Sequence, residues 1–236
     1  MKGKTLTQES SLSYPAFREV LPASVNDMKN SLSLVLQTLD LIQEDATNGI
    51  DLNALAMVQY EATRMQNTLT ELQNFYLFER DLLTIQMNES YVVDIVEEQV
   101  AANATLWKTK NIQVDVAGDE DLCAYIDASL VSSVINIGLV NASRYTRDRV
   151  NVQVEQVEGS VLIAIDDNGD GYPDFILEKF SNLLAGDQAS ETSAQALAWY
   201  YCNAIMEIHK NHDLKGRIDL SNSSSLEGGR FEIYLP

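Results

Sequence analysis

The first third of the chain carries apolar residues at the spacing of packed helices. Successive apolar positions are separated by alternating steps of four and three residues, first at Leu21, Val25, Met28, Leu32, Val35, Leu39 and Ile42, and then at Leu55, Val58, Ala62, Met65, Leu69, Leu72 and Tyr76. Steps of this kind form a heptad pattern. The polar segment 43–51 interrupts the pattern, with a turn at Asn48-Gly49 and with Asp51 in position to cap the second helix. The sequence therefore predicts an antiparallel helical hairpin over residues 15–83.

Further apolar residues widen this heptad seam into a broad face: Leu34, Leu36, Leu41, Leu52, Phe75, Leu77 and Phe78. Two helices cannot cover such a face between themselves, so a homodimeric four-helix bundle is the simplest way to bury it. The alternative is that the hairpin packs against the C-terminal part of its own chain.

Beyond residue 83 the pattern changes to short alternating segments mixed with helical ones. Strands are expected at 84–87, 112–116, 122–126, 150–155, 160–166, 217–220 and 230–235, and helices at 91–108, 128–145 and 194–211. Helices and an antiparallel-leaning sheet in this order predict an α+β fold, a two-layer sandwich over residues 84–236. The polar residues 1–14 are expected to be disordered.

Charge limits the partners of the protein. The 236 residues carry a formal net charge of −19, with a pI near 4.3. Such a surface repels nucleic acids and anionic membranes, so protein partners with basic patches are favoured. The alternative is that acidity serves solubility alone.

Two cysteines far apart in the sequence, Cys123 and Cys202, offer no metal-binding spacing. No apolar run is long enough to span a bilayer, and the first residues lack the apolar segment of a signal peptide. We therefore expect a cytoplasmic protein with reduced thiols.

The first predicted helix carries the segment Asn26-Asp27-Met28-Lys29-Asn30-Ser31-Leu32. This segment resembles the phosphoacceptor box of bacterial sensor histidine kinases, with Asn26 where that family has its phosphorylated histidine. An asparagine amide nitrogen has a delocalised lone pair and is a poor nucleophile, so Asn26 should not be phosphorylated.

The neighbours of Asn26 fit the family better. Asp27 and Asn30 match the acidic-x-x-Asn/Thr pattern that supports dephosphorylation of a response regulator in this family. The resemblance implies that the Asn30 amide orients a water for attack on an aspartyl phosphate, and positioning alone can supply such a rate. With Asn26 and Lys29, these residues form the expected docking surface for a receiver domain.

Two further motifs resemble the nucleotide-binding boxes of the histidine-kinase ATPase domain, which belongs to the GHKL type. Asn141 and Arg144 take the positions of the family's Mg²⁺-holding asparagine and phosphate-contacting cation, although Ile137 replaces a second asparagine. Asp167, Gly169 and Gly171 match the DxGxG box, whose aspartate accepts a hydrogen bond from adenine and whose glycines let the backbone approach the base.

The segment from Asp166 to Gly171 also resembles the start of an EF-hand calcium loop. Its twelfth position is Leu177 rather than glutamate, and an apolar strand precedes it where an EF-hand has a helix. The ATPase reading is therefore favoured.

The third nucleotide box departs from the family. Ala194, Ala196 and Ala198 stand at the three glycine positions of the lid motif, and the expected lid at 180–193 has no evident cation for phosphate. The alanine run is a good helix start. We expect no cofactor, with ATP and Mg²⁺ bound at most weakly at a vestigial site. Residues 228–236 resemble the closing strand of the domain, and His209 and His212 are interpreted as structural or surface residues.

The resemblance implies a histidine-kinase-like pseudokinase of a two-component system that forms homodimers and binds response-regulator receiver domains. Response-regulator phosphatase activity would be compatible with these residues. One alternative is an active histidine kinase or phosphotransferase in which Asn26 replaces the native histidine. Another is a regulator that dimerises with a different histidine kinase.

Overall fold

The computed structural model describes residues 17–44, 52–80, 82–184, 194–211 and 213–236. The expectations for residues 1–14, the turn at Asn48-Gly49, the cap at Asp51, the lid segment 185–193 and His212 lie outside the described residues. The side chains of Asp27, Ala194 and Ala196 also lie outside this description.

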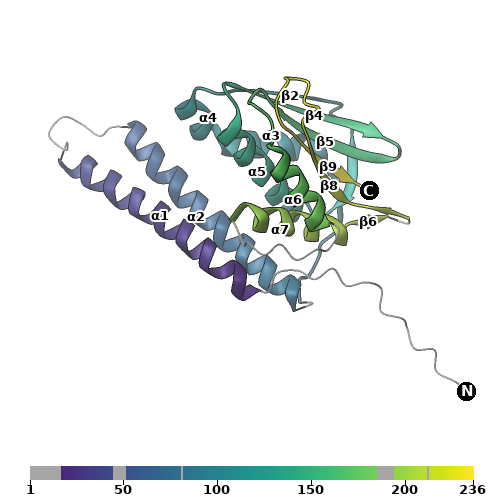
Figure 1. Cartoon of the computed structure of the whole chain (residues 1–236), viewed down its shortest axis with the longest axis horizontal. Helices are drawn as coiled ribbons and strands as arrows, with labels where there is room; N and C mark the ends of the chain where they lie inside the picture. Colours follow the sequence, from purple (N-terminus) through teal and green to yellow (C-terminus); the bar gives the residue numbers. More distant parts are fainter. Residues whose placement is uncertain (1–16, 45–51, 81, 185–193, 212) are drawn as a thin grey trace, which may run out of the picture.

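Two helices of equal length form the predicted hairpin: α1 (Phe17–Glu44) and α2 (Leu52–Glu79). They run side by side along one flank of the molecule (Figure 1). The hairpin is therefore confirmed, with bounds close to those that the heptad pattern predicts.

The C-terminal part is an α+β sandwich. Its main sheet has the order β2-β4-β5-β9-β8, formed by β2 (Gln113–Gly118), β4 (Arg149–Val157), β5 (Ser160–Asp167), β9 (Arg230–Leu235) and β8 (Arg217–Ser221). The β2–β4 pair is parallel and the other pairs are antiparallel. Small antiparallel pairs join β1 (Asn88–Tyr91) to β3 (Cys123–Ile126) and β6 (Lys210–Asn211) to β7 (Leu214–Lys215).

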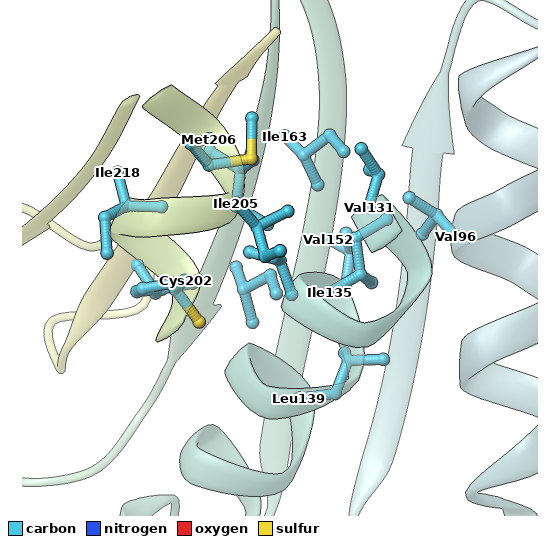
Figure 2. Packing of buried hydrophobic residues seen from close by; sticks show 14 of the residues in the cluster. Val96, Val131, Ile135, Leu139, Val152, Ile163, Cys202, Ile205, Met206 and Ile218 are labelled. Atoms are coloured by element: carbon cyan, nitrogen blue, oxygen red, sulfur yellow. The ribbon is translucent and has the colours of Figure 1, made fainter. Parts of the chain in front are cut away.

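Helices cover one face of this sheet: α3 (Val92–Ala102), α5 (Ala128–Tyr145) and α7 (Ala194–Ile208), with α4 (Ala104–Lys110) and α6 (Asp174–Leu184) beside them (Figure 1). The core lies between the layers, where Val131 and Ile135 of α5 meet Val152 and Ile163 of the sheet (Figure 2). The two-layer α+β prediction is confirmed.

Some sequence-based bounds were wrong. No strand forms at 84–87; β1 begins at Asn88 instead. The helix expected at 91–108 is broken at Asn103, whose side chain donates to the Gln99 carbonyl and to Asn136 Oδ1. Helix α6 was not predicted, and α7 ends at Ile208 rather than at Asn211.

Asp127 is a buried junction between the two parts of the chain. Its Oδ1 accepts a hydrogen bond from Leu130 N–H at 3.1 Å and caps α5. Its Oδ2 accepts from Gln86 N–H at 2.8 Å, in the segment that follows the hairpin. The Asp127 carboxylate thus holds both the first turn of α5 and the segment that leads from α2 to β1.

The heptad seam of the hairpin divides into two sets. Val35 and Leu72 are buried, and Met28 packs against the common core, to which α2 and the C-terminal domain both contribute. The other set remains exposed and, together with the neighbouring Leu36, forms what we call the apolar stripe: Val25, Leu32, Leu36, Leu39, Leu55, Leu69 and Tyr76. A hairpin packed on its own C-terminal domain therefore still leaves half of its seam uncovered.

Contact between the hairpin and the C-terminal domain is direct. Phe75 of α2 is buried in the common core, and Asn74 Nδ2 donates to the Tyr201 hydroxyl at 3.2 Å. This hydroxyl also lies 2.8 Å from Ser133 Oγ of α5. The alternative that the hairpin packs on its own C-terminal domain is thus correct for one of its faces.

Candidate functional site

The box on α1 presents its polar residues to solvent. Asn26, Lys29 and Asn30 are exposed. Residues three and four positions apart lie on the same side of a helix, so these three side chains share one face. Ser31, next in sequence, points inward and accepts a hydrogen bond from Arg64 Nε of α2 at 2.9 Å.

The second group of predicted residues surrounds the loop between β5 and α6. The Asp167 side chain is nearly inaccessible, and its Oδ1 accepts hydrogen bonds from Gly169 N–H at 2.8 Å and Gly229 N–H at 3.2 Å. Burial raises the pKa of the Asp167 carboxyl, against the two backbone donors, which lower it. Two backbone N–H groups of the protein therefore already occupy Asp167 Oδ1.

The glycines of this loop are required by space and by backbone conformation. A Cβ on Gly169 would lie 2.2 Å from the Tyr145 carbonyl oxygen. Gly171 has φ of +77°, a conformation that L-residues rarely adopt. Asn222 fixes the next residue, because its Oδ1 accepts from Tyr172 N–H at 2.7 Å and its Nδ2 donates to the Tyr172 carbonyl at 2.9 Å.

Tyr172 links the loop to α5. Its side chain is buried and hydrogen-bonded to Asn141, the residue expected to hold Mg²⁺. Its ring also lies against Gly229, where a Cβ would be 2.9 Å from Tyr172 Cε2 and 2.8 Å from Asp167 Oδ2. Burial raises the pKa of the Tyr172 phenol well above its ordinary value. The structure thus brings Asn141 and Asp167 together, with the Tyr172 ring beside both.

Arg144 lies elsewhere. It is exposed at the end of α5 and lines a cavity between this helix and the hairpin, together with Asn141. The phosphate-contact position therefore faces α2 across this cavity.

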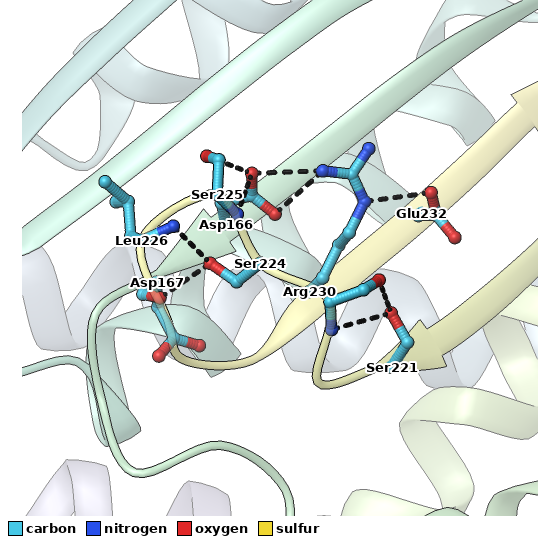
Figure 3. Close-up of polar contacts among 9 residues, drawn as sticks. Asp166, Asp167, Ser221, Ser224, Ser225, Leu226, Arg230 and Glu232 are labelled. Atoms are coloured by element: carbon cyan, nitrogen blue, oxygen red, sulfur yellow. Dashed lines mark hydrogen bonds and ion pairs between the residues drawn. The ribbon is translucent and has the colours of Figure 1, made fainter.

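A buried ion pair between Arg230 and Asp166 lies next to the loop between β5 and α6. Arg230 Nη1 lies 3.1 Å from both carboxylate oxygens of Asp166, and Ser225 Oγ donates to Asp166 Oδ2 at 2.6 Å (Figure 3). Arg230 Nε also contacts Glu232 Oε1 at 2.9 Å. These contacts argue against the calcium loop, because Asp166 is committed to Arg230 while Asp170 pairs with Arg147 on the surface.

Sequence reasoning missed Tyr172, Asn222 and Arg230 as parts of this site. Tyr172 directly follows Gly171, so its nearness to the loop was available from the sequence. Its bond to Asn141 was not, because the two residues are 31 positions apart and meet only in the folded sheet–helix arrangement. The expectation that Ala194 and its neighbours begin a helix is confirmed by α7.

Within the described residues, no helix is both long enough and apolar enough to cross a membrane. His209 is fully buried, as expected for a structural histidine.

Comparisons with known proteins agree with this architecture. Residues 126–236 match the family described as histidine kinase-, DNA gyrase B-, and HSP90-like ATPase. The alginate biosynthesis sensor protein KinB of Pseudomonas aeruginosa is 23% identical over 223 residues, which is 92% of this chain and 35% of KinB. The chain thus spans only about a third of the length of this curated relative.

Two solved structures extend the comparison. The histidine kinase AdeS of Acinetobacter baumannii aligns with a TM-score of 0.56 at 17% identity, over 88% of this chain and 95% of that chain. The catalytic domain of the histidine kinase ThkA aligns with a TM-score of 0.54 at 19% identity, over 64% of this chain and 95% of that chain. Residues 126–236 therefore match the histidine kinase-, DNA gyrase B- and HSP90-like ATPase family, and the chain has the fold of a sensor histidine kinase core.

Proposed function

We propose that this chain is a histidine-kinase-like signalling protein that lacks autokinase activity, dimerises through its hairpin and docks response-regulator receiver domains on α1. The observation that carries the proposal is the contrast between two sites. The polar box of α1 is open to solvent, whereas the Asp167 loop is closed by Tyr172. We place this activity in the cytoplasm.

Residues at the phosphoacceptor position and at the nucleotide site both support the loss of autokinase activity. Asn26 offers no nucleophilic nitrogen to attack a phosphorus atom. At the nucleotide end, Asp167 Oδ1 already accepts two backbone hydrogen bonds, and Asn141 is bonded to Tyr172. These contacts compete with an adenine nucleotide and with Mg²⁺, so we propose that the protein binds ATP and Mg²⁺ at most weakly.

Docking of a receiver domain is supported by the surface of α1. Asn26, Lys29 and Asn30 form one accessible face with a hydrogen-bonding group at each position. A cation such as Lys29 suits the acidic phosphorylation site of a receiver domain.

Homodimerisation is supported by the apolar stripe. It runs along both helices at heptad spacing, and Leu36 and Leu69 are more than half exposed. A second copy of the hairpin offers the same stripe in a two-fold arrangement, which would complete a four-helix bundle.

A dephosphorylation assay tests the proposed function. Response-regulator receiver domains of the same host are charged with acetyl phosphate, and loss of the aspartyl phosphate is followed with and without the protein. We expect binding of one receiver domain and loss of phosphate that is faster by about tenfold or more. Asn30→Ala should remove the acceleration while preserving binding within a few fold.

Gln37→Ala is the matched control, because Gln37 is an exposed amide two turns further along α1. Asn26→His addresses the phosphotransfer alternative, since a histidine at this position could take the phosphoryl group from the receiver domain. Failure of every host receiver domain to bind would rule out the proposed function.

A further inference from the structure

The two-stranded sheet of β1 and β3 has one buried face and one face that is largely open to solvent. In its antiparallel register Tyr91 lies opposite Cys123, and Glu89 lies opposite Tyr125. Directly opposite residues and alternate residues of a strand share a face, so these four side chains lie together. The alternate positions of β3 are buried in the core. We call the four residues the small-sheet face.

Two aromatic rings dominate the small-sheet face. Tyr91 is 53% exposed and Tyr125 is 58% exposed. They are diagonal neighbours across the two strands, and such neighbours lie about 7–8 Å apart in antiparallel sheets. Tyrosine rings provide a large contact area with only two side-chain torsions to fix on binding. The face therefore offers a binding partner two adjacent aromatic rings.

Negative charge surrounds the rings. Asp94 of α3 and the acidic turn 119–121 before β3 are exposed. Burial raises the pKa of the Cys123 thiol, and three nearby carboxylates raise it further. These carboxylates belong to Glu89, Asp121 and Asp94. Their charges therefore act on the middle of the small-sheet face.

No basic residue is close in sequence to balance this charge. Lysine, arginine and histidine are absent between Arg80 and Lys108 and again between Lys110 and Arg144, the stretches that form β1, α3, β2 and β3. Within the described ranges of the chain, the carboxylates around the face form no ion pair. Like charges gathered without a counter-charge repel one another. A positively charged partner would relieve this repulsion.

The arrangement does not suit a metal ion or a second copy of the chain. In the part of the chain that the structure describes, no three histidine, cysteine or carboxylate side chains converge as metal ligands. A second copy would bring the same negative charge to a two-fold contact. Separate carboxylates around two rings fit a partner that carries several positive charges spaced along a chain.

Arginine is the cation that matches this surface best. Its planar guanidinium stacks on aromatic rings and pairs with carboxylates, whereas a lysine ammonium is a compact and strongly hydrated charge. The chain itself contains such a contact, because the guanidinium carbon of Arg217 lies 3.5 Å from the centre of the Tyr234 ring.

We propose that the small-sheet face docks a basic, arginine-containing segment of a partner protein. Guanidinium groups of the segment stack on Tyr91 and Tyr125, and Glu89 and Asp121 pair with its charges. This surface belongs to the C-terminal domain, whereas the box proposed to dock receiver domains belongs to α1. The inference therefore requires neither receiver binding nor phosphatase activity.

Calorimetric titration of the full chain with three short peptides tests this proposal. Glycine alternates with arginine in the first peptide, with lysine in the second and with glutamine in the third. The titrations are made at low salt, where exposed charges are least screened. We expect the arginine peptide to bind about fivefold or more tightly than the lysine peptide, and the glutamine peptide to show no binding.

Paired tyrosine variants test the role of the rings. Tyr91→Leu combined with Tyr125→Leu should weaken binding of the arginine peptide about tenfold and remove its advantage over the lysine peptide. Tyr91→Phe combined with Tyr125→Phe keeps both rings and should bind within about twofold of the natural protein. Both positions are more than half exposed, so all of these variants should fold.

A charge variant with a matched control locates the peptide. Asp121→Asn should weaken binding about threefold or more, whereas Glu155→Gln removes the same charge from an exposed residue of β4 and should change it little. Equal affinity for the arginine and lysine peptides would overturn the proposal, as would equal effects of the leucine and phenylalanine pairs or of the two charge variants. No receiver domain is present in these titrations, so a negative result leaves the proposed function untouched.

Discussion

The ring of His209 accepts a hydrogen bond from the backbone N–H of Asp127, with Nε2 3.1 Å from that nitrogen. The other ring nitrogen, Nδ1, lies 2.7 Å from the Ile205 carbonyl, to which it donates. Both bonds together require the neutral imidazole with its proton on Nδ1. Helix α7 is thereby joined to the start of α5.

This arrangement predicts a pH dependence of stability. Burial lowers the pKa of His209 below its ordinary value of 6.5. The unfolded chain then binds a proton that the folded chain does not, so the free energy of unfolding decreases as pH falls from about 6.5 toward the lower, folded-state pKa. The contribution is fully present above pH 6.5. Urea unfolding between pH 7.5 and 5.5 measures it.

His209→Gln should reduce this part of the pH dependence, while lowering stability at pH 7.5 by about 1–2 kcal/mol. His212→Gln removes the other histidine of the chain and should retain the pH dependence. The prediction is wrong if the two variants show the same slope against pH.

Replacing Tyr172 should open the nucleotide site. We expect the natural protein to show no binding of ATP with Mg²⁺ below millimolar concentration. Tyr172→Ile removes the hydroxyl that is bonded to Asn141 and part of the ring beside Gly229, so affinity should rise by about tenfold or more. Fluorescent nucleotide titration measures this, with Tyr125→Ile as the control on an exposed tyrosine of β3. Micromolar binding by the natural protein would contradict the closed arrangement.

The apolar stripe predicts a specific effect on assembly. Leu69→Gln changes a residue that is 55% exposed and should weaken the dimer about tenfold or more, with little loss of monomer stability. Phe175→Gln is the matched control, since Phe175 is 65% exposed on α6. Sedimentation equilibrium distinguishes them, and an unchanged dimer in Leu69→Gln would exclude the stripe as the interface.

Arg230→Met should destabilise the C-terminal domain strongly. Its partner Asp166 is fully buried and would be left without a cation, at a cost of about 3–5 kcal/mol. Arg217→Met is the control: this guanidinium lies 3.5 Å from the centre of the Tyr234 ring on the surface, and its loss should cost about 1 kcal/mol or less. Thermal and denaturant unfolding compare the two, and equal losses would contradict the role given to the buried pair.

Local patterns were enough to predict the hairpin and most strands. The heptad spacing from Leu21 to Tyr76 reports directly on helix packing, and the helix at 128–145 has the predicted bounds because its apolar face is continuous. Helix α6 was missed because its second half, from residue 180, had been assigned to the lid that the resemblance implies.

The site was harder to predict, because its decisive contacts join distant segments. Asp167, Gly169 and Gly171 lie where their motif indicates, yet the closure of the loop depends on Tyr172 reaching Asn141 across the fold. The heptad pattern also could not predict which seam residues would be covered. Met28 and Leu32 are both apolar, but Met28 packs against the common core whereas Leu32 remains exposed.

The two oxygens of Asp127 give the molecule a mechanical connection. One accepts from Gln86 N–H, in the segment that leads from α2 to β1, and the other holds the first turn of α5, the helix that carries Asn141 near its far end. Replacing Asp127 would therefore release two segments at once, the one that leads from α2 to β1 and the first turn of α5.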